Sequence, residues 1–357
     1  MKAAFILLSL AMLPATAQEA SNGFDLSTTL TTEAFYSHQL AQPPREGTPL
    51  DGAFRALFYP TWKINSHWTL TGSVQVRSRP LFADEFKTQG HGIKTNVLQA
   101  HLDYSRIAAK RSIVVRVGML PTAFGSFLAR YDDTRNPLTQ MPAAYGYYYR
   151  PVTTVGLMGA QVDATLGGAD FRAQLVNSSP LNPRSIFDHD QYGSWAGGAG
   201  YTIRQGFRVG VSALRGPYLD RHYPFFFPGE GRPRSSPGSG YGIDVAWGHG
   251  PWNVYGELQK FQMTYKAIPD FNEHTGYAEV RRVLAPRWYI AERAEYIRAS
   301  AFRGYQTYET AVGFRPSVHQ LVKVGYQIQQ GSVIRGTLAN VAEIQVVSTL
   351  PSFSLAR

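Results

Sequence analysis

The sequence contains no cysteine, which excludes disulfide bonds, thiolate metal sites and a cysteine nucleophile. Charged residues are also scarce, at 17% of the chain, unlike the composition of a charge-rich cytosolic enzyme. Beyond its N-terminal segment the chain has no apolar run of the roughly 20 residues that a membrane-spanning helix needs. These absences disfavour both a charge-rich soluble enzyme and a helical membrane protein.

The N-terminal segment has the features of a secretory signal peptide. Lys2 precedes an apolar run from Ala3 to Leu13, and the small residues of Ala15-Thr16-Ala17 follow it. The run is too short for a membrane anchor, so we expect residues 1–17 to be removed by cleavage before Gln18. Residues 18–357 then form the mature, exported chain.

The chain is rich in glycine and tyrosine, with 34 and 21 residues, and apolar and polar residues alternate along much of it. In WTLTGSVQVR, residues 68–77, Val74 and Val76 point to one side and Gln75 and Arg77 to the other, because successive side chains of a strand face opposite ways. About sixteen segments follow this pattern. They are residues 24–38, 51–63, 67–78, 94–106, 111–119, 152–166, 169–177, 192–204, 206–215, 240–248, 251–264, 274–285, 287–299, 305–316, 318–330 and 337–350.

The same spacing assigns faces in NVLQAHLDY, residues 96–104. It places Leu98 and Leu102 on the apolar side, opposite Val97 and His101. Every second residue is therefore expected to share one environment throughout this segment.

The breaks between the segments alternate in length. One set consists of the short stretches INSH, RIAAK, GG, RQG, GHGP, APR and PSV, whereas the other includes LAQPPREGTPL and residues 79–93, 120–151, 178–191 and 216–239. Short periplasmic turns and long external loops are typical of outer-membrane barrels, in which closure pairs every backbone amide in the lipid. We therefore predict an all-β transmembrane antiparallel β-barrel of about 16 strands in the outer membrane of a Gram-negative cell.

One stretch resembles a known family. Residues 115–137, VRVGMLPTAFGSFLARYDDTRNP, are similar to the Gly-x-x-x-Pro-Phe-Gly segment of outer-membrane porins related to the phosphate-selective (O/P-type) family. The segment stands here as Gly118, Pro121, Phe124 and Gly125, with two residues inserted before the phenylalanine. The resemblance implies a mid-barrel strand that leads into a long loop, passive diffusion through the barrel, and a homotrimer. The family's basic constriction residues have no residue-by-residue match here, so phosphate specificity is not implied.

The C-terminus departs from the pattern of such barrels, which commonly end on an aromatic residue. This chain ends PSFSLAR, with Phe353 four residues before the end. We expect Pro351 to end the last strand, because proline cannot donate a hydrogen bond to a sheet.

The longest break, residues 120–151, is the candidate constriction loop, since a porin selects solutes by an inward-folded loop and by the charges that line its lumen. Its charged residues are Arg130, Asp132, Asp133, Arg135 and Arg150. The alternation places further basic residues on the lumen face, namely Arg55, Arg77, Arg116, Arg172, Arg208, Arg315 and Lys323. Acidic residues share that face, including Asp103, Asp163, Asp244, Glu257, Glu309 and Glu343, so many charges should pair across strands. A solvated external loop is the alternative for residues 120–151.

The charge balance bears on the partners. The formal net charge is +10, which favours a mild preference for small hydrophilic anions. The basic residues are scattered and the chain is exported, so we expect no nucleic-acid partner. The expected surroundings are outer-membrane lipid and, by the resemblance, further copies of the chain.

Other functions remain open at this point. A sugar-selective channel would use the aromatic residues of AAYGYYYRP, residues 143–151, as platforms. A barrel-embedded hydrolase would need serine and histidine at one height on the lipid-facing side, and no Gly-x-Ser-x-Gly motif is present. The adjacent Asp188, His189 and Asp190 do not converge easily on one ion, so we expect neither a metal site nor a cofactor.

Overall fold

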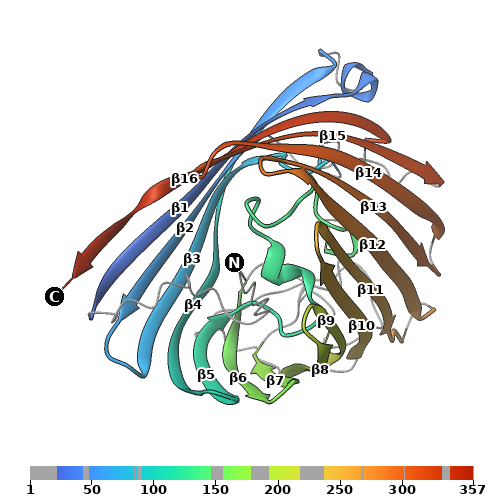
Figure 1. The fold of residues 1–357 in the computed structure, drawn as a ribbon. Coiled ribbons are helices and arrows are strands. Elements are labelled where there is room, and N and C mark those ends of the chain that lie inside the picture. The colour runs from blue at the N-terminus through green and yellow to red at the C-terminus, as the bar shows by residue number, and fades with distance from the viewer. Residues whose placement is uncertain are drawn as a thin grey trace.

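The computed structural model describes residues 22–42, 48–83, 85–86, 91–145, 156–177, 193–217, 237–266, 269–300, 302–331 and 338–356. Within them sixteen antiparallel strands form one closed barrel, in which each strand pairs with its neighbours in sequence and β1 pairs with β16 (Figure 1). The strands are β1 (Gly23–Tyr36), β2 (Leu50–Lys63), β3 (Trp68–Arg79), β4 (Gly92–Ala108), β5 (Arg111–Leu120), β6 (Leu157–Leu166), β7 (Ala169–Val176), β8 (Ser194–Arg204), β9 (Phe207–Pro217), β10 (Pro237–His249), β11 (Trp252–Met263), β12 (Phe271–Ala285), β13 (Trp288–Ala299), β14 (Phe302–Ser317), β15 (Gln320–Gly331) and β16 (Asn340–Ala356).

The predicted fold is confirmed, and the strand bounds differ from the predicted segments by a few residues. In the described ranges three short 3-10 helices accompany the strands: η1 (His38–Ala41), η2 (Phe127–Arg130) and η3 (Ala143–Tyr145). No helix in the described ranges is both long and apolar enough to cross a membrane. The predicted signal peptide lies outside the described residues.

The two rims differ as predicted. At one rim, tight turns join β4 to β5 at residues 109–110, β6 to β7 at 167–168 and β12 to β13 at 286–287. The other rim carries the longer connections, among them residues 37–49 and 121–156, although β13 and β14 are joined there by a short one. We call these the turn rim and the loop rim.

The barrel wall is apolar outside and polar inside. In β1, Leu30 is 37% exposed on the outer face, whereas Thr31 and Glu33 point inward and are 1% and 7% exposed. In β3, Gln75 and Arg77 are buried inside the barrel. This inversion of the usual pattern is the one expected of a wall with lipid outside and polar groups within.

The faces predicted for Val97 and Leu98 are wrong, because β4 contains a bulge. Ser73 pairs with Gln99 but the next residue, Val74, pairs with Val97, so Leu98 is an extra residue in the strand. Leu98 is 7% exposed and Val97 is 38% exposed, the reverse of the predicted arrangement. A bulge of one residue shifts the alternation that follows from strand geometry.

The expected end of the last strand is also wrong. β16 continues beyond Pro351 to Ala356, and Phe353 pairs with Leu26 of β1. The register between β1 and β16 shifts between Leu26 and Thr28, opposite the proline. Pro351 thus occupies an irregular position of the ladder, where a missing amide hydrogen is tolerated.

Candidate functional site

Residues Pro121–Tyr145, which we call the inner loop, leave β5 and fold into the interior of the barrel. Figure 1 shows this segment crossing the space enclosed by the strands. Its atoms hydrogen-bond to side chains of strands around the wall, from Thr29 of β1 and Gln75 of β3 to Gln174 of β7, Glu295 of β13 and Glu343 of β16. The predicted inward course therefore holds for the described part of residues 120–151.

The Gly-Pro-Phe-Gly segment directs the chain from the wall into the lumen. Gly118 has a φ of +138°, and a Cβ there would lie 2.4 Å from the carbonyl oxygen of Ala100. The Pro121 carbonyl accepts a hydrogen bond of 2.7 Å from Gln174 Nε2, and Gln174 Oε1 accepts one of 3.1 Å from the Ala123 amide. A single inward glutamine of β7 thus holds the start of the loop against the wall.

Gly125 lies against Tyr145, which is at the other end of the inner loop. Its φ is +75°, a conformation that favours glycine, and a Cβ there would lie 1.9 Å from the Tyr145 hydroxyl. Its amide donates to Ser212 Oγ of β9 at 3.3 Å, and the next amide, that of Ser126, donates to Glu257 of β11. The absence of a side chain lets the two ends of the inner loop meet.

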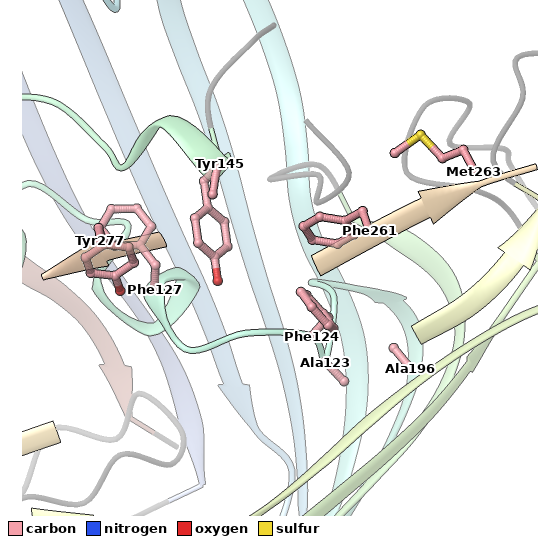
Figure 2. Close-up of a cluster of buried hydrophobic side chains, with 9 residues drawn as sticks. Ala123, Phe124, Phe127, Tyr145, Ala196, Phe261, Met263 and Tyr277 are labelled. Atoms are coloured by element: carbon pink, nitrogen blue, oxygen red, sulfur yellow. The ribbon is translucent and has the colours of Figure 1, made fainter. Parts of the chain in front are cut away.

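Aromatic side chains pack the ends of the inner loop against β11 and β12 (Figure 2). The rings of Phe124 and Phe261 have centroids 5.3 Å apart, as do those of Phe127 and Tyr145. The Tyr145 hydroxyl donates to Glu257 at 3.0 Å, and burial together with the Glu257 charge raises the pKa of Tyr145 well above its usual value. Tyr145 is fully buried, so in this structure it offers no face to a sugar ring.

Arg130 anchors the middle of the inner loop to β12. Its guanidinium forms an ion pair with Glu279 and donates to the Tyr277 hydroxyl at 3.0 Å. It also lies over the Tyr255 ring, with Cζ 3.9 Å from the ring centroid. Arg130 is therefore bound to the wall, and its charge is compensated there.

The two aspartates bind the opposite wall. Asp133 forms an ion pair with Arg55 of β2 and accepts a hydrogen bond of 2.6 Å from Thr31, while Asp132 accepts one of 3.1 Å from Thr29. Burial disfavours the charge on Asp133, but the positive charges of Arg55 and Lys323 outweigh it and lower the pKa of Asp133. The carboxylate is thus the stable form of this buried group.

The last third of the inner loop is held mainly through backbone atoms. Lys323 of β15 donates to the Leu138 carbonyl at 2.9 Å, and Glu309 of β14 accepts hydrogen bonds of 2.8 Å and 3.0 Å from the amides of Thr139 and Gln140. Arg293 of β13 donates to Glu309 at 2.6 Å and to the Gln140 carbonyl at 3.0 Å. Because these bonds reach backbone groups, the loop sequence alone does not reveal them.

The predicted lumen-facing bases all point inward, but they fall into two groups. Arg55, Arg77 and Lys323 are 3%, 6% and 0% exposed, because Asp133, Glu85 and the Leu138 carbonyl cover them. The half-buried group consists of Arg116, Arg172, Arg208 and Arg315. The side chains of the half-buried group stay partly accessible from the interior of the barrel.

The half-buried bases differ in how far their charge is compensated. Arg116 forms ion pairs with Asp163 and Asp103, and Arg315 donates to the Thr134 carbonyl at 3.3 Å. Arg172 has no hydrogen-bond or ion-pair partner in the parts of the chain that the structure describes. It is the inward base with the most available charge in this group.

Arg208 lies between two aspartates, beside glycines of β8 and β9. It bonds to Asp170 at 2.7 Å and to Asp244 at 2.6 Å. A Cβ at Gly200 would lie 2.0 Å from Arg208 Nη2, and one at Gly210 would lie 2.4 Å from Asp244 Oδ2. Glycines of β8 and β9 thus make the space in which this group of charges lies.

The remaining loop charges are placed differently. Arg135 is exposed at the surface of the inner loop, and Arg150 lies outside the described residues, as do Tyr147–Tyr149 and the Asp188-His189-Asp190 triplet. The sequence reasoning missed the buried Arg293, Glu279 and Glu295. Alternation within residues 287–299 could have placed Arg293 and Glu295 on the inner face.

Among the described residues, no group of three or more histidine, aspartate and glutamate side chains could hold a metal ion. Within the same ranges no histidine ring is hydrogen-bonded to a serine hydroxyl; His101 bonds instead to Asp103 at 2.7 Å inside the barrel.

Comparisons with known proteins identify the fold. No family model matches the chain, and no curated protein matches its sequence. Among solved structures, the chain is similar to Salmonella typhi OmpF in complex with daunomycin, with a TM-score of 0.63 and 10% identity over 92% of this chain and 98% of that one. It is similar to the anion-selective porin from Comamonas acidovorans, with a TM-score of 0.58 and 10% identity over 94% and 99%. It is also similar to a trimer form of OmpT, an outer membrane protein of Vibrio cholerae, with a TM-score of 0.57 and 12% identity over 93% and 100%. The chain therefore has the porin fold over nearly its whole length.

Proposed function

We propose that the protein is an outer-membrane porin that lets small hydrophilic solutes diffuse passively, and that it is not an enzyme. The observation that carries this proposal is the inner loop, which is fixed by ion pairs on opposite walls of a closed barrel, at Arg55–Asp133 and Arg130–Glu279. An ordered loop across a polar lumen narrows the passage without closing it by a separate domain. The porin fold of the similar structures supports the same function.

Selectivity is assigned to two sets of residues. The inner loop, with Arg130, Asp132, Asp133 and Arg135, sets the width and the local field, and Arg150 belongs to the same connection. The half-buried bases Arg116, Arg172, Arg208 and Arg315 face the passage, and the unpaired charge of Arg172 gives a mild anion preference. Arg55, Arg77 and Lys323 act indirectly, through the inner loop and its neighbours.

The remaining assignments follow from this function. Residues 1–17 direct export, residues 18–357 form the barrel in the outer membrane of a Gram-negative cell, and the chain assembles as a homotrimer. The trimer form of the similar OmpT structure supports the assembly. Kinship with the phosphate-selective (O/P-type) porins rests on residues 115–137 and on the overall strand plan.

Planar-bilayer recording tests the function. The refolded mature chain should give discrete channels, and a KCl gradient should give a reversal potential of the sign that indicates a mild preference for chloride. If the folded barrel inserts and carries no current, the porin assignment is wrong. If current is present but potassium is preferred, the anion assignment is wrong and the porin assignment stands. Chemical crosslinking in the membrane tests the trimer separately.

A further inference from the structure

Basic side chains form a row on the outer face of the barrel near the loop rim. Lys260 of β11 is the direct pairing partner of His274 of β12, which in turn pairs with Arg298 of β13. All three are exposed and point away from the lumen, because they alternate with the buried residues of their strands. Each lies within a few residues of the loop-rim end of its strand, where a lipid headgroup region would lie.

The charge of this row is not compensated by the protein. None of the three side chains has a hydrogen-bond or ion-pair partner among the described residues. Lys260 and Arg298 lie on either side of His274, two strands apart, and both carry a positive charge at neutral pH. The row is therefore a site of net positive charge that an external anion would stabilise.

An apolar hollow lies beside the row on the same face. Its volume is about 670 Å³, and Lys260 and His274 belong to its lining. The aromatic side chains of Trp195, Tyr241 and Tyr296 line the hollow. Gly197 and Ala213 also line it, and their small size leaves space between the larger side chains. The lining is mainly apolar, with exposed residues such as Leu258.

A cationic row beside an apolar hollow matches an amphiphile with an anionic head and a hydrocarbon chain. Long basic side chains at a membrane interface interact with anionic headgroups, and apolar surface below them accepts acyl chains. We propose that the outer face of β8–β13 binds a phosphate-bearing lipid, with its phosphate on Lys260, His274 and Arg298 and an acyl chain in the hollow.

The outer face of a second copy fits the row less well. Among the outward positions of the described strands, Glu292 is the one acidic residue, and it lies four residues from the turn-rim end of β13. A neighbouring copy packed by its outer face would bring apolar groups or further cations to the row. Charge complementarity therefore favours a lipid phosphate.

The proposal is tested by titrating the refolded mature chain, in a neutral detergent, with lipid A that carries two phosphates and with the same glycolipid after removal of its phosphates. We expect the wild type to bind the phosphorylated form at least about tenfold more tightly. The variant K260Q/H274Q/R298Q should lose this difference. The variant R106Q/R111Q is the matched control, because both arginines are exposed on outward positions at the turn rim, and it should keep the difference.

A second variant tests the hollow. Ala213→Phe should weaken binding of both glycolipids by a similar factor while leaving the preference for phosphate. Equal binding of the two glycolipids by the wild type would overturn the role of the row. Displacement of the lipid by millimolar inorganic phosphate alone would overturn the lipid assignment in favour of a free anion. A change in oligomeric mass in K260Q/H274Q/R298Q, measured by sedimentation equilibrium, would assign the face to a second copy instead. Heat-modified mobility on gels confirms that each variant is folded.

Discussion

Arg55 of β2 and Asp133 of the inner loop form an ion pair in which the two side chains are 2% and 1% exposed. Arg55 Nε also donates to Asp133 at 3.1 Å, and Arg55 Cζ lies 4.8 Å from the centroid of the Tyr131 ring. The inner loop is therefore anchored by a wall residue whose guanidinium the loop itself helps to bury.

Asp133→Asn should destabilise the inner loop strongly, because it leaves the Arg55 charge buried without its partner. Loss of one member of a buried pair destabilises by roughly 3–5 kcal/mol. We expect larger and noisier single-channel currents and a lower thermal midpoint. The double variant R55M/D133L removes both charges and should recover part of the lost stability; a double variant worse than the single one would contradict this role of the pair.

Gly125→Ala should displace one end of the inner loop. The added Cβ would lie 1.9 Å from the Tyr145 hydroxyl and 2.9 Å from Glu257 Oε1, at a φ of +75°. We expect a loss of roughly 1–3 kcal/mol from the strained backbone, with a further loss from the clash. Channel conductance and thermal unfolding measure both effects.

Gly250→Ala is the control for this change. Gly250 has a φ of +56° in the β10–β11 turn, but a Cβ there would meet nothing within 4 Å. The Gly250→Ala variant should show the same backbone strain as Gly125→Ala and leave the channel conductance unchanged. Equal conductance changes in the two variants would refute the steric account of Gly125.

Arg172→Gln should reduce the anion preference, because it removes a half-buried inward charge that has no partner in the described residues. Reversal potentials in a KCl gradient should move toward zero or toward cation preference. Arg77→Gln is a comparison, since Arg77 is held by Glu85 at 2.6 Å and 2.8 Å and is 6% exposed. If R77Q shifts the reversal potential as much as R172Q, exposure does not decide which bases select ions.

The lowered pKa of Asp133 predicts the pH dependence of the loop anchor. A carboxyl whose pKa is lower in the folded state stabilises that state above its unfolded pKa, and the contribution is lost as the pH falls through the folded pKa. The ordinary value is 3.8, so the anchor should be intact from pH 8 to about pH 5 and weaken below 3.8. The difference in thermal midpoint between wild type and D133N should be constant above pH 5 and shrink in acid. A difference that already shrinks at pH 6 would contradict the lowered pKa.

Strand positions were predictable because each strand separates lipid from a polar interior. Val74 and Val76 alternate with Gln75 and Arg77 because of that separation: the valines face outward and the polar residues face the interior. Prediction failed at Leu98 and Pro351, where a bulge or a register shift interrupts the period of two. These irregularities depend on the pairing partner, and a single strand does not encode its partner.

The site was predictable in part. Residues 120–151 stood out as the longest break, and its charges at Arg130 and Asp133 do contact the wall. The burial of Lys323 was not predictable, because its partner is the backbone carbonyl of Leu138. Alternation assigns a side chain to the interior but does not say whether water or another segment occupies that interior.

The inner loop also spans the line along which the barrel closes. Thr29 and Thr31 of the first strand hold Asp132 and Asp133, while Glu343 of the last strand accepts a hydrogen bond of 2.9 Å from Gln140. The first and last strands come together only when the cylinder is complete. The inner loop consequently bridges the seam, so that β1 and β16 separate only if the loop also gives up its hydrogen bonds to one of the two strands.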